Sequence, residues 1–256
     1  MPLPRKKRPV RWILYGFILL VAVFAGWMIS RWISYQKARL THYKEFGITI
    51  PDDYTIHGID VSKYQSLIAW EEVKEMNVAN IRLGFAFIKA TEGIGNTDPQ
   101  FSRNWRKAKD NNIIRGAYHF FIATKDGKMQ AENFIKRVEL QKGDLPPVLD
   151  VEQRYGASKA QLRKEVKKWL DTAEEYYKVK PVIYTNVDFY NQNLGSEFDE
   201  YPLWIAHYYQ HKTPRINRPW SFWQHSDMGN VNGIVSKVDF NVFNGDSLSF
   251  KQLLLP

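Results

Sequence analysis

From about residue 55 onward, apolar runs rich in β-forming residues alternate with amphipathic segments, and this rhythm limits the possible folds more than any other feature. Five runs are expected as strands: IHGIDVS, IRLGFAFIKAT, IIRGAYHFF, PPVLDVE and KPVIYTN. Helices are expected between them, at AWEEVKEMN, PQFSRNWRKAKDNN, KMQAENFIKRVELQ and SKAQLRKEVKKWLDTAEEYYK. Three further strand-like runs follow without comparable helices: PLWIAHY, WSFWQHS and SKVDFNVFNG. The alternation predicts an α/β fold with a largely parallel sheet, closed as an irregular TIM-like (β/α) barrel of about eight strands with fewer helices.

The fourth of these strands ends in two carboxylates, in PPVLDVEQR. Because successive side chains of a strand point to opposite faces, Val148, Asp150 and Glu152 are expected on one face. Two like charges beside a hydrophobic core raise each other's pKa and lose solvation, which folding alone does not require. Arg154 is the nearest partner for a purely structural salt bridge. Ser158 is expected to cap the helix that follows.

Two more aspartates fall in predicted strands, Asp60 in the first and Asp239 in the last. Each alone has a simple explanation, because an Asp near a strand end commonly caps a helix or shapes a loop. In a closed barrel, however, the first and last strands are neighbours, and barrel sites lie at the C-terminal ends of the strands. The sequence therefore predicts four carboxyl groups around one barrel mouth.

Such a cluster suits glycoside hydrolysis. One carboxylic acid must stay protonated near neutral pH to protonate the leaving oxygen, and a second group must stabilise positive charge, activate water or orient the substrate. Sugar rings also stack on aromatic faces, although core packing is the simpler explanation for any single aromatic residue. The candidate aromatics near predicted strand ends are Tyr118, Tyr184, Trp204, Tyr208 and Trp223.

These segments together resemble the lysozymes of glycoside hydrolase family 25, muramidases that cut peptidoglycan between N-acetylmuramic acid and N-acetylglucosamine. The resemblance covers nearly all of residues 56–246, and its motifs stand in the order of the family. They are HGIDVSKYQ, FAFIKATEG with DPQFSRNW, GAYHFF, LPPVLDVE, PVIYT, LWIAHY and FWQHSDMGNVNGIVSKVDFNVFNG. The family's fold, an irregular barrel of eight strands and fewer helices, agrees with the alternation described above.

The resemblance implies a role for each candidate. Glu152 is implied as the general acid and Asp150 as its partner, which orients the 2-acetamido group of the substrate or acts as base or stabiliser. Asp60 and Asp239 are implied to line the cleavage subsite. Candidate substrate-binding residues are Tyr118, Tyr184, Trp204 and Gln224, joined by Tyr208 as an aromatic residue near a strand end. The family is thought to retain anomeric configuration, which strand spacing alone leaves open.

One motif departs from the family. Ser62-Lys63-Tyr64-Gln65 stands where His-Trp or an equivalent aromatic pair is expected, so Lys63 and Tyr64 are expected to alter one subsite. Two alternatives stay open. A chitinase-like hydrolase is disfavoured because only the last pair of its D-x-x-D-x-D-x-E motif is present. A non-catalytic, membrane-anchored peptidoglycan-binding or scaffolding protein would not need the Asp/Glu pair.

No cofactor or metal is expected. The histidines show no HxxxH or HExxH pair on a helix, and KATEGIGNTD lacks the Lys-Ser/Thr ending of a phosphate loop. The histidines considered are His57, His119, His207, His211 and His225. Zero cysteines exclude disulfides and Cys-ligated metals. Residues 1–50 carry nine Lys or Arg and one Glu, so they hold most of the net charge of +9. The rest of the chain is nearly neutral, which argues against a nucleic-acid-binding domain, because such a domain needs a basic face.

The N-terminal arm predicts a membrane anchor. Trp12 to Ser30 carries no charge and is close to the ~20 residues needed to span a bilayer. Basic residues before it favour a cytoplasmic N-terminus: Arg5, Lys6, Lys7, Arg8 and Arg11. A signal peptide cleaved near Ala25 is the alternative. Either way the bulk of the chain is exported to the periplasmic or extracellular side.

The sequence is accordingly divided into a cytoplasmic basic segment (1–11), a transmembrane helix (12–30), a stalk (31–54) and a hydrolase barrel (55–256). The expected partners are peptidoglycan glycan strands and the membrane, and the expected oligomeric state is a monomer. Tethering could raise the local enzyme concentration at the wall, in place of wall-binding repeats.

Overall fold

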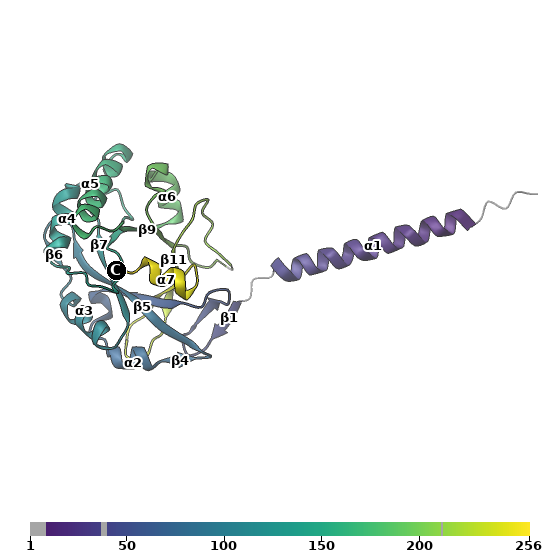
Figure 1. The fold of residues 1–256 in the computed structure, drawn as a ribbon, viewed down its shortest axis with the longest axis horizontal. Coiled ribbons are helices and arrows are strands. Elements are labelled where there is room, and N and C mark those ends of the chain that lie inside the picture. The colour runs from purple at the N-terminus through teal and green to yellow at the C-terminus, as the bar shows by residue number, and fades with distance from the viewer. Residues whose placement is uncertain (1–8, 37–39, 211) are drawn as a thin grey trace, which may run out of the picture. The chain divides into compact units, whose positions relative to one another are not determined.

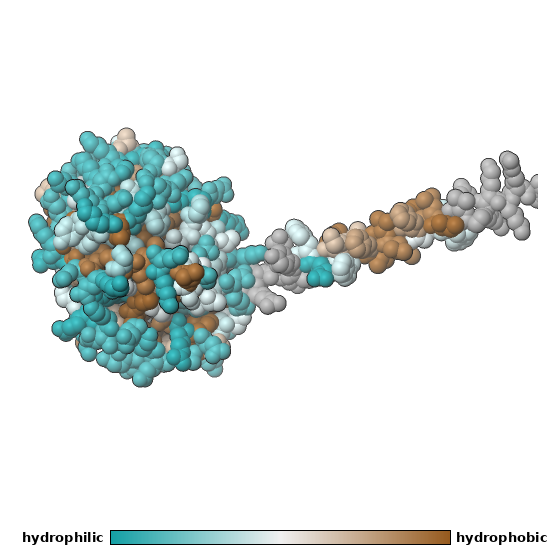
Figure 2. Space-filling view, in the orientation of Figure 1, coloured by the Kyte–Doolittle hydropathy of each residue, from teal (hydrophilic) through white to brown (hydrophobic). Residues whose placement is uncertain are grey.

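The computed structural model describes residues 9–36, 40–210 and 212–256, which form two compact units, Met1–Arg39 and Leu40–Pro256. In the first unit, helix α1 spans Pro9–Gln36 (Figure 1). Its segment Trp12–Trp32 is long and apolar enough to cross a membrane, and none of it is buried. Figure 2 shows hydrophobic side chains along most of this helix. Residues 1–8 of the predicted cytoplasmic segment lie outside the described residues.

The second unit is built on a closed barrel of eight strands, as the alternation predicted. Around the ring the order is β3-β12-β11-β10-β9-β8-β7-β5, and β5 pairs with β3 to close it. The strands span His57–Val61 (β3), Ile81–Glu92 (β5), Ile114–Phe120 (β7), Val148–Asp150 (β8), Val182–Asn186 (β9), Leu203–Ala206 (β10), Phe222–Gly229 (β11) and Val238–Phe243 (β12). All neighbours are parallel except β12, which runs antiparallel to both β11 and β3.

Helices cover the outside of the barrel between most of the parallel strands (Figure 1). They are α2 (Trp70–Glu75), α3 (Phe101–Asp110), α4 (Gly127–Ile135), α5 (Lys159–Tyr177) and α6 (Val187–Asn193). The predicted cap of α5 is confirmed, because the Ser158 side chain accepts a hydrogen bond from Gln161 N. As expected, the described residues between β10 and β12 contain no helix. Shorter elements are the 3₁₀ turns Lys63–Gln65 and Ser196–Phe198, and strands β4 (Asn77–Val78) and β6 (Asn96–Thr97), both paired with β5.

Aromatic side chains fill the barrel interior. The Phe87 and Trp204 rings stack with centroids 4.2 Å apart, and Phe222 packs edge-on against Phe87 at 5.1 Å. Helix α7 (Ser247–Leu253) adds Phe250, whose ring lies 5.0 Å from Phe243. Phe222 begins β11 and Phe243 ends the antiparallel β12, so α7 closes the barrel end opposite the C-terminal ends of the parallel strands. The interior is therefore solid at that end, and any site must lie at the other.

The barrel unit begins earlier than predicted. Strands β1 (Leu40–Tyr43) and β2 (Ile48–Pro51) form an antiparallel hairpin that belongs to the second unit. Its side chains Phe46 and Ile50 are at most 1% exposed and join the core. The prediction of a stalk over residues 31–54 is therefore wrong from Leu40 onward, because alternate residues of the hairpin are buried in the core and not exposed to solvent. Residues 37–39 of the predicted stalk lie outside the described ranges.

Candidate active site

The four predicted carboxyl groups line one cavity at the open mouth of the barrel, with a volume of about 260 Å³. Asp60 is the fourth residue of β3, Asp150 is the last residue of β8, and Glu152 follows two residues later. Asp239 is the second residue of β12. Because β12 runs antiparallel, its beginning lies at the edge where the parallel strands end. The sequence predicts Asp239 at this mouth, but it does not predict the reversed direction of β12.

Asp60 and Asp239 face each other directly across the β3–β12 pair. Gln224 Nε2 donates to Asp60 Oδ2 at 2.7 Å, and Asn241 Nδ2 donates to the same oxygen at 2.8 Å. Burial raises the pKa of Asp60 to about 6, while these hydrogen bonds counteract the rise. Burial, followed by the charge of Asp60, raises the pKa of Asp239 to about 9. Asp239 is thus the protonated partner that donates to the Asp60 carboxylate, whose charge the two amide hydrogen bonds stabilise.

Asp150 and Glu152 form a second hydrogen-bonded carboxyl pair. Strand β8 ends at Asp150, yet extended pairing continues, because Val151 N donates to Tyr184 O at 2.9 Å. This keeps Glu152 on the face of Asp150, as strand alternation predicted. Burial raises the pKa of both groups, and for Asp150 the neighbouring Glu152 charge raises it further. Asp150 is buried, whereas Glu152 is only partly buried and is the more accessible of the two from the cavity.

Lys89 is the one basic side chain among the described residues that line this cavity, and the sequence reasoning missed it. Its Nζ lies 2.7 Å from Glu92 Oε2 and 4.5 Å from the centroid of the Phe120 ring. The Lys89 charge lowers the pKa of both Asp150 and Glu152, opposing the effect of burial. A lysine at the end of the apolar run LGFAFI was the signal that could have identified it.

The predicted substrate-binding residues also line the cavity, held by a relay of hydrogen bonds. The hydroxyls of Tyr184 and Tyr208 both donate to Gln224 Oε1, at 2.8 and 2.7 Å. Gln224 in turn donates to Asp60, so the two phenols set the orientation of an amide that solvates the carboxylate.

Trp204 and Tyr118 are buried more deeply than a sugar platform requires. Trp204 is 1% exposed, and its Nε1 donates to Asn241 Oδ1 at 2.7 Å, so it forms the floor of the cavity. Tyr118 is 9% exposed and packs edge-on against Trp204. Asn241, which this indole orients toward Asp60, was also missed. It follows Asp239 by two residues and therefore shares its strand face, which is a signal that alternation offers.

Other candidates lie elsewhere. Trp223 belongs to the core outside the barrel, where its Nε1 donates to His207 O. His57, His119 and His225 are buried, and burial lowers their pKa to about 4, 3 and 3. Among the described residues no group of His, Asp or Glu is arranged to hold a metal ion, and His211 lies outside them. At the cavity rim, Tyr64 is exposed and Lys63 Nζ lies 5.6 Å from its ring centroid.

Comparison with known proteins identifies the family of this site. The model of a family described as glycosyl hydrolases family 25 matches residues 59–234. The chain belongs to glycosyl hydrolase family 25. The matched region contains Asp60, Asp150 and Glu152 and ends before Asp239, and the hairpin β1–β2 precedes it.

Individual family 25 proteins resemble most of the chain. Lysozyme M1 of Streptomyces globisporus is 36% identical over 215 residues, which cover 77% of this chain and 70% of that protein. A family 25 glycosyl hydrolase structure from Bacillus anthracis has a TM-score of 0.74 at 33% identity, covering 80% of this chain and 96% of that one. The uncharacterized protein YegX of Escherichia coli O6:H1 is 46% identical over 249 residues, or 94% of this chain and 92% of its own length.

Proposed function

We propose that this family 25 protein is a lysozyme that cleaves the β-1,4 bond between N-acetylmuramic acid and N-acetylglucosamine in peptidoglycan. Relatives named as lysozymes and as N,O-diacetylmuramidases support this activity. The observation that carries the proposal is the pairing of four carboxyl groups in one cavity, where burial raises the pKa of every member of both pairs above its ordinary value. A general acid needs a proton at neutral pH, and raised carboxyl pKa values provide it.

In the proposed reaction, Glu152 delivers the proton to the glycosidic oxygen. The bond from the anomeric carbon to that oxygen breaks, its electron pair stays with the protonated leaving group, and positive charge develops on the sugar ring. The negative charge left on the pair stabilises this charge. Water then adds to the anomeric carbon and returns a proton to the pair. Asp150 orients the 2-acetamido group or acts as base or stabiliser in these steps.

The second carboxyl pair and the polar aromatics fit substrate binding. The Asp60 carboxylate can accept hydrogen bonds from sugar hydroxyl or amide groups, and the protonated Asp239 can donate one. Tyr184, Tyr208 and Gln224 form the wall behind them. Tyr118 and Trp204 lie beneath that wall and are buried, so we assign them the role of shaping the cavity and not of stacking on a sugar ring.

A non-catalytic peptidoglycan-binding protein is the second candidate. The four buried carboxyl groups argue against it. Burying a carboxyl group that is not fully paired destabilises the folded protein by several kcal/mol, and a protein that only binds glycan would have no need of this cost. Binding to a neutral glycan can be achieved by aromatic and amide side chains alone, without that cost.

The test of catalysis uses Glu152→Gln in the full chain, solubilised in mild detergent. Removal of the general acid is expected to lower the rate of peptidoglycan clearing by at least ~10²-fold while the circular dichroism spectrum is unchanged. Glu75→Gln, an exposed glutamate on α2, is the matched control and is expected to clear at the wild-type rate. Clearing by Glu152→Gln within a few-fold of wild type would remove Glu152 from the role of acid. Wild-type protein that binds peptidoglycan without clearing it would support the binding protein.

Mass spectrometry of the products tests the bond that is cut. A reducing-end muramic acid is expected for a muramidase, whereas a reducing-end glucosamine would identify a glucosaminidase and contradict the proposal.

For location, we propose a single-pass membrane protein with a cytoplasmic N-terminus. The family 25 assignment supports action outside the cytoplasm, in the periplasm or extracellular space. The apolar segment Trp12–Trp32 suits either an anchor or a signal sequence. The segments 1–11 and 12–30 are assigned to the cytoplasm and the bilayer on this basis, and the enzyme is proposed to act as a monomer.

A further inference from the structure

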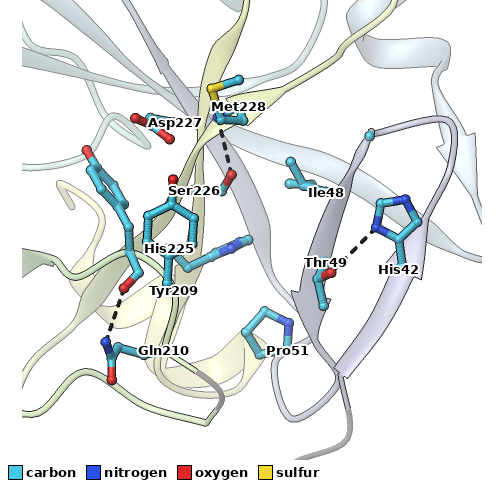
Figure 3. A pocket seen from close by; sticks show the side chains of 12 residues that line it. His42, Ile48, Thr49, Pro51, Tyr209, Gln210, His225, Ser226, Asp227 and Met228 are labelled. Atoms are coloured by element: carbon cyan, nitrogen blue, oxygen red, sulfur yellow. Dashed lines mark hydrogen bonds between the residues drawn. The ribbon is translucent and has the colours of Figure 1, made fainter.

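A second cavity, of about 460 Å³, lies beside the carboxyl cavity and is larger than it. One wall comes from the hairpin β1–β2 and the other from β11 and the segment after β10 (Figure 3). The hairpin precedes the region that matches the family, so this cavity includes a wall outside the shared family core. Its volume is within the range of about 300–1,000 Å³ typical of ligand pockets.

The two cavities share a wall. Tyr208 lines both, and its hydroxyl is the group that donates to Gln224 in the carboxyl cavity. Asp227, which also lines the second cavity, is close enough to Asp239 for its charge to contribute to the raised pKa of that residue. A linear polymer bound across the carboxyls therefore has a short path past Tyr208 into the second cavity.

The second cavity presents an exposed aromatic ring in a constrained backbone. Tyr209 is 85% exposed and has φ of +57°, in the left-handed region that non-glycine residues rarely adopt. Such backbone strain is found disproportionately at functional sites. Gln210 Nε2 donates to Tyr208 O at 3.1 Å, which braces the turn that carries the ring.

The rest of the lining is amphipathic. Figure 3 shows apolar Ile48 and Pro51 on the hairpin side, facing Ser226 and Met228 of β11 across the cavity. Polar groups stand at intervals around them: His42, Thr49, Gln210, Ser226 and Asp227. Sugar rings have the same mixed character, with apolar faces and polar edges.

The charge of the residues that line the second cavity distinguishes between a peptide and a sugar as its ligand. None of the described residues that line the second cavity is Lys or Arg, and Asp227 contributes a negative charge. The acidic peptide stem of peptidoglycan would find no cationic partner there and would meet repulsion from Asp227. An N-acetylglucosamine unit of the strand, which is uncharged, meets neither cost.

We propose that the cavity between the hairpin β1–β2 and β11 is an additional glycan subsite, which binds a sugar unit of the strand on one side of the cleavage point. Tyr209 stacks on the ring of that sugar, and the hairpin side chains complete the pocket. The inference rests on the proposed function for the identity of the glycan. It predicts that the enzyme binds long strands better than short ones.

The test compares peptide-free glycan strands of two lengths, a disaccharide, short enough to stay near the carboxyl groups, and an octasaccharide, which extends well beyond them. Binding is measured by calorimetry with full-length chain in mild detergent, in the Glu152→Gln background so that the strand stays intact. Adding Tyr209→Ala is expected to weaken octasaccharide binding about tenfold and leave disaccharide binding unchanged. Tyr209→Phe, which keeps the ring, is expected to bind both as the parent does.

Tyr176→Ala is the matched control, an exposed tyrosine on α5 that lines neither cavity, and it is expected to change neither affinity. Equal effects of Tyr209→Ala on both lengths, or none on either, would overturn the subsite. An effect only on peptide-bearing strands would assign the cavity to the peptide stem instead. Wild-type protein that does not cleave peptidoglycan would contradict the proposed lysozyme function. The effect of Tyr209→Ala on the binding of long and short strands would still test the subsite independently.

Discussion

At the scale of single residues, one side of the site is defined by how the Asp60–Asp239 pair divides its proton. Asp60 has two amide donors on one oxygen, and Asp239 has the charge of Asp60 opposite it. Asp60, which accepts the amide hydrogen bonds, stays ionised, and Asp239 keeps the proton. The same site therefore offers an acceptor and a donor of equal size a few ångströms apart, which suits recognition of hydroxyl and amide groups on one sugar.

The Asp239 proton makes stability depend on pH in a direction unusual for a carboxyl group. Burial raises its pKa from 3.8 to about 9, so the folded state holds a proton that the unfolded chain releases. The stability from this group is complete below pH about 4 and is lost as pH rises toward about 9. Asp239→Asn, which mimics the protonated acid, is expected to raise the melting temperature by roughly 2–4 °C at pH 8 and less at pH 5.

The measurement is thermal unfolding of both proteins across that pH range, followed by circular dichroism. Asp53→Asn, an exposed aspartate that lines neither cavity, serves as the control, and its effect on melting is expected to be small at every pH. A difference between Asp239→Asn and wild type that is the same at pH 5 and pH 8 would contradict the protonated state assigned to Asp239.

Strand alternation and motif order were enough to predict nine residues that line the cavity. Asn241 and Lys89 were not predicted, because their importance comes from contacts across the barrel. Asn241 matters through the indole of Trp204 and the carboxylate of Asp60, which are far from it in sequence. Alternation places Asn241 on the strand face of Asp239, but it does not reveal these two contacts.

At the scale of secondary-structure elements, the barrel depends on glycine where aromatic rings cross its interior. A Cβ on Gly58 of β3 would lie 2.5 Å from the Phe85 ring, which is fully buried and cannot move aside. Gly58→Ala is therefore expected to destabilise the protein by about 1–3 kcal/mol, measured by urea unfolding. Gly84→Ala in the adjacent β5 is the matched control, since its Cβ would lie 3.8 Å from the nearest atom, and its stability should stay near wild type. Equal effects of the two substitutions would exclude the ring contact as the cause.

The hairpin β1–β2 gives a second prediction at this scale. Phe46 is fully buried and packs edge-on against Phe240 of β12 with centroids 5.2 Å apart. Phe46→Ala is expected to lower the free energy of unfolding by about 3–5 kcal/mol, because it leaves a cavity in the core. Thr41→Ala, exposed on the same hairpin, is expected to change it by less than about 0.5 kcal/mol. Wild-type stability of Phe46→Ala would mean that the hairpin is a dispensable appendage, as a stalk would be.

Two features of the secondary structure could not be predicted from the sequence: the hairpin β1–β2 and the reversed direction of β12. The first four βα repeats were recognisable because each buries one helix face against a strand, whereas the short helix α6 after β9 was not predicted. The hairpin has two strands of four residues each, too short for a clear period, and its burial depends on Phe240 nearly two hundred residues away. The direction of β12 depends on its two neighbours in the ring, since hydrophobic alternation is the same for either direction.

At the scale of the whole molecule, charge and hydropathy divide the chain in the same place as the fold. Most of the net charge of +9 lies in residues 1–50, and Trp12–Trp32 is exposed and apolar in the first unit. The nearly neutral barrel unit has no electrostatic reason to approach an anionic wall or membrane on its own. An anchor would supply that proximity, because tethering raises the effective concentration of the enzyme near its polymer without any new contact.

Membrane anchoring predicts that the full chain sediments with membranes and resists extraction by salt and alkaline carbonate. Leu19→Arg combined with Val21→Arg places two charges in the middle of the span, each at a cost of about 2.5–3.5 kcal/mol, and is expected to move the protein out of the membrane fraction. The control is Leu19→Ala with Val21→Ala, which keeps the span uncharged and should stay with the membranes. N-terminal sequencing separates the alternatives, since an intact N-terminus supports an anchor. A soluble wild-type protein that begins near Gly26 would instead identify a cleaved signal, and the enzyme would then have to find its wall by diffusion and by the affinity of its glycan subsites alone.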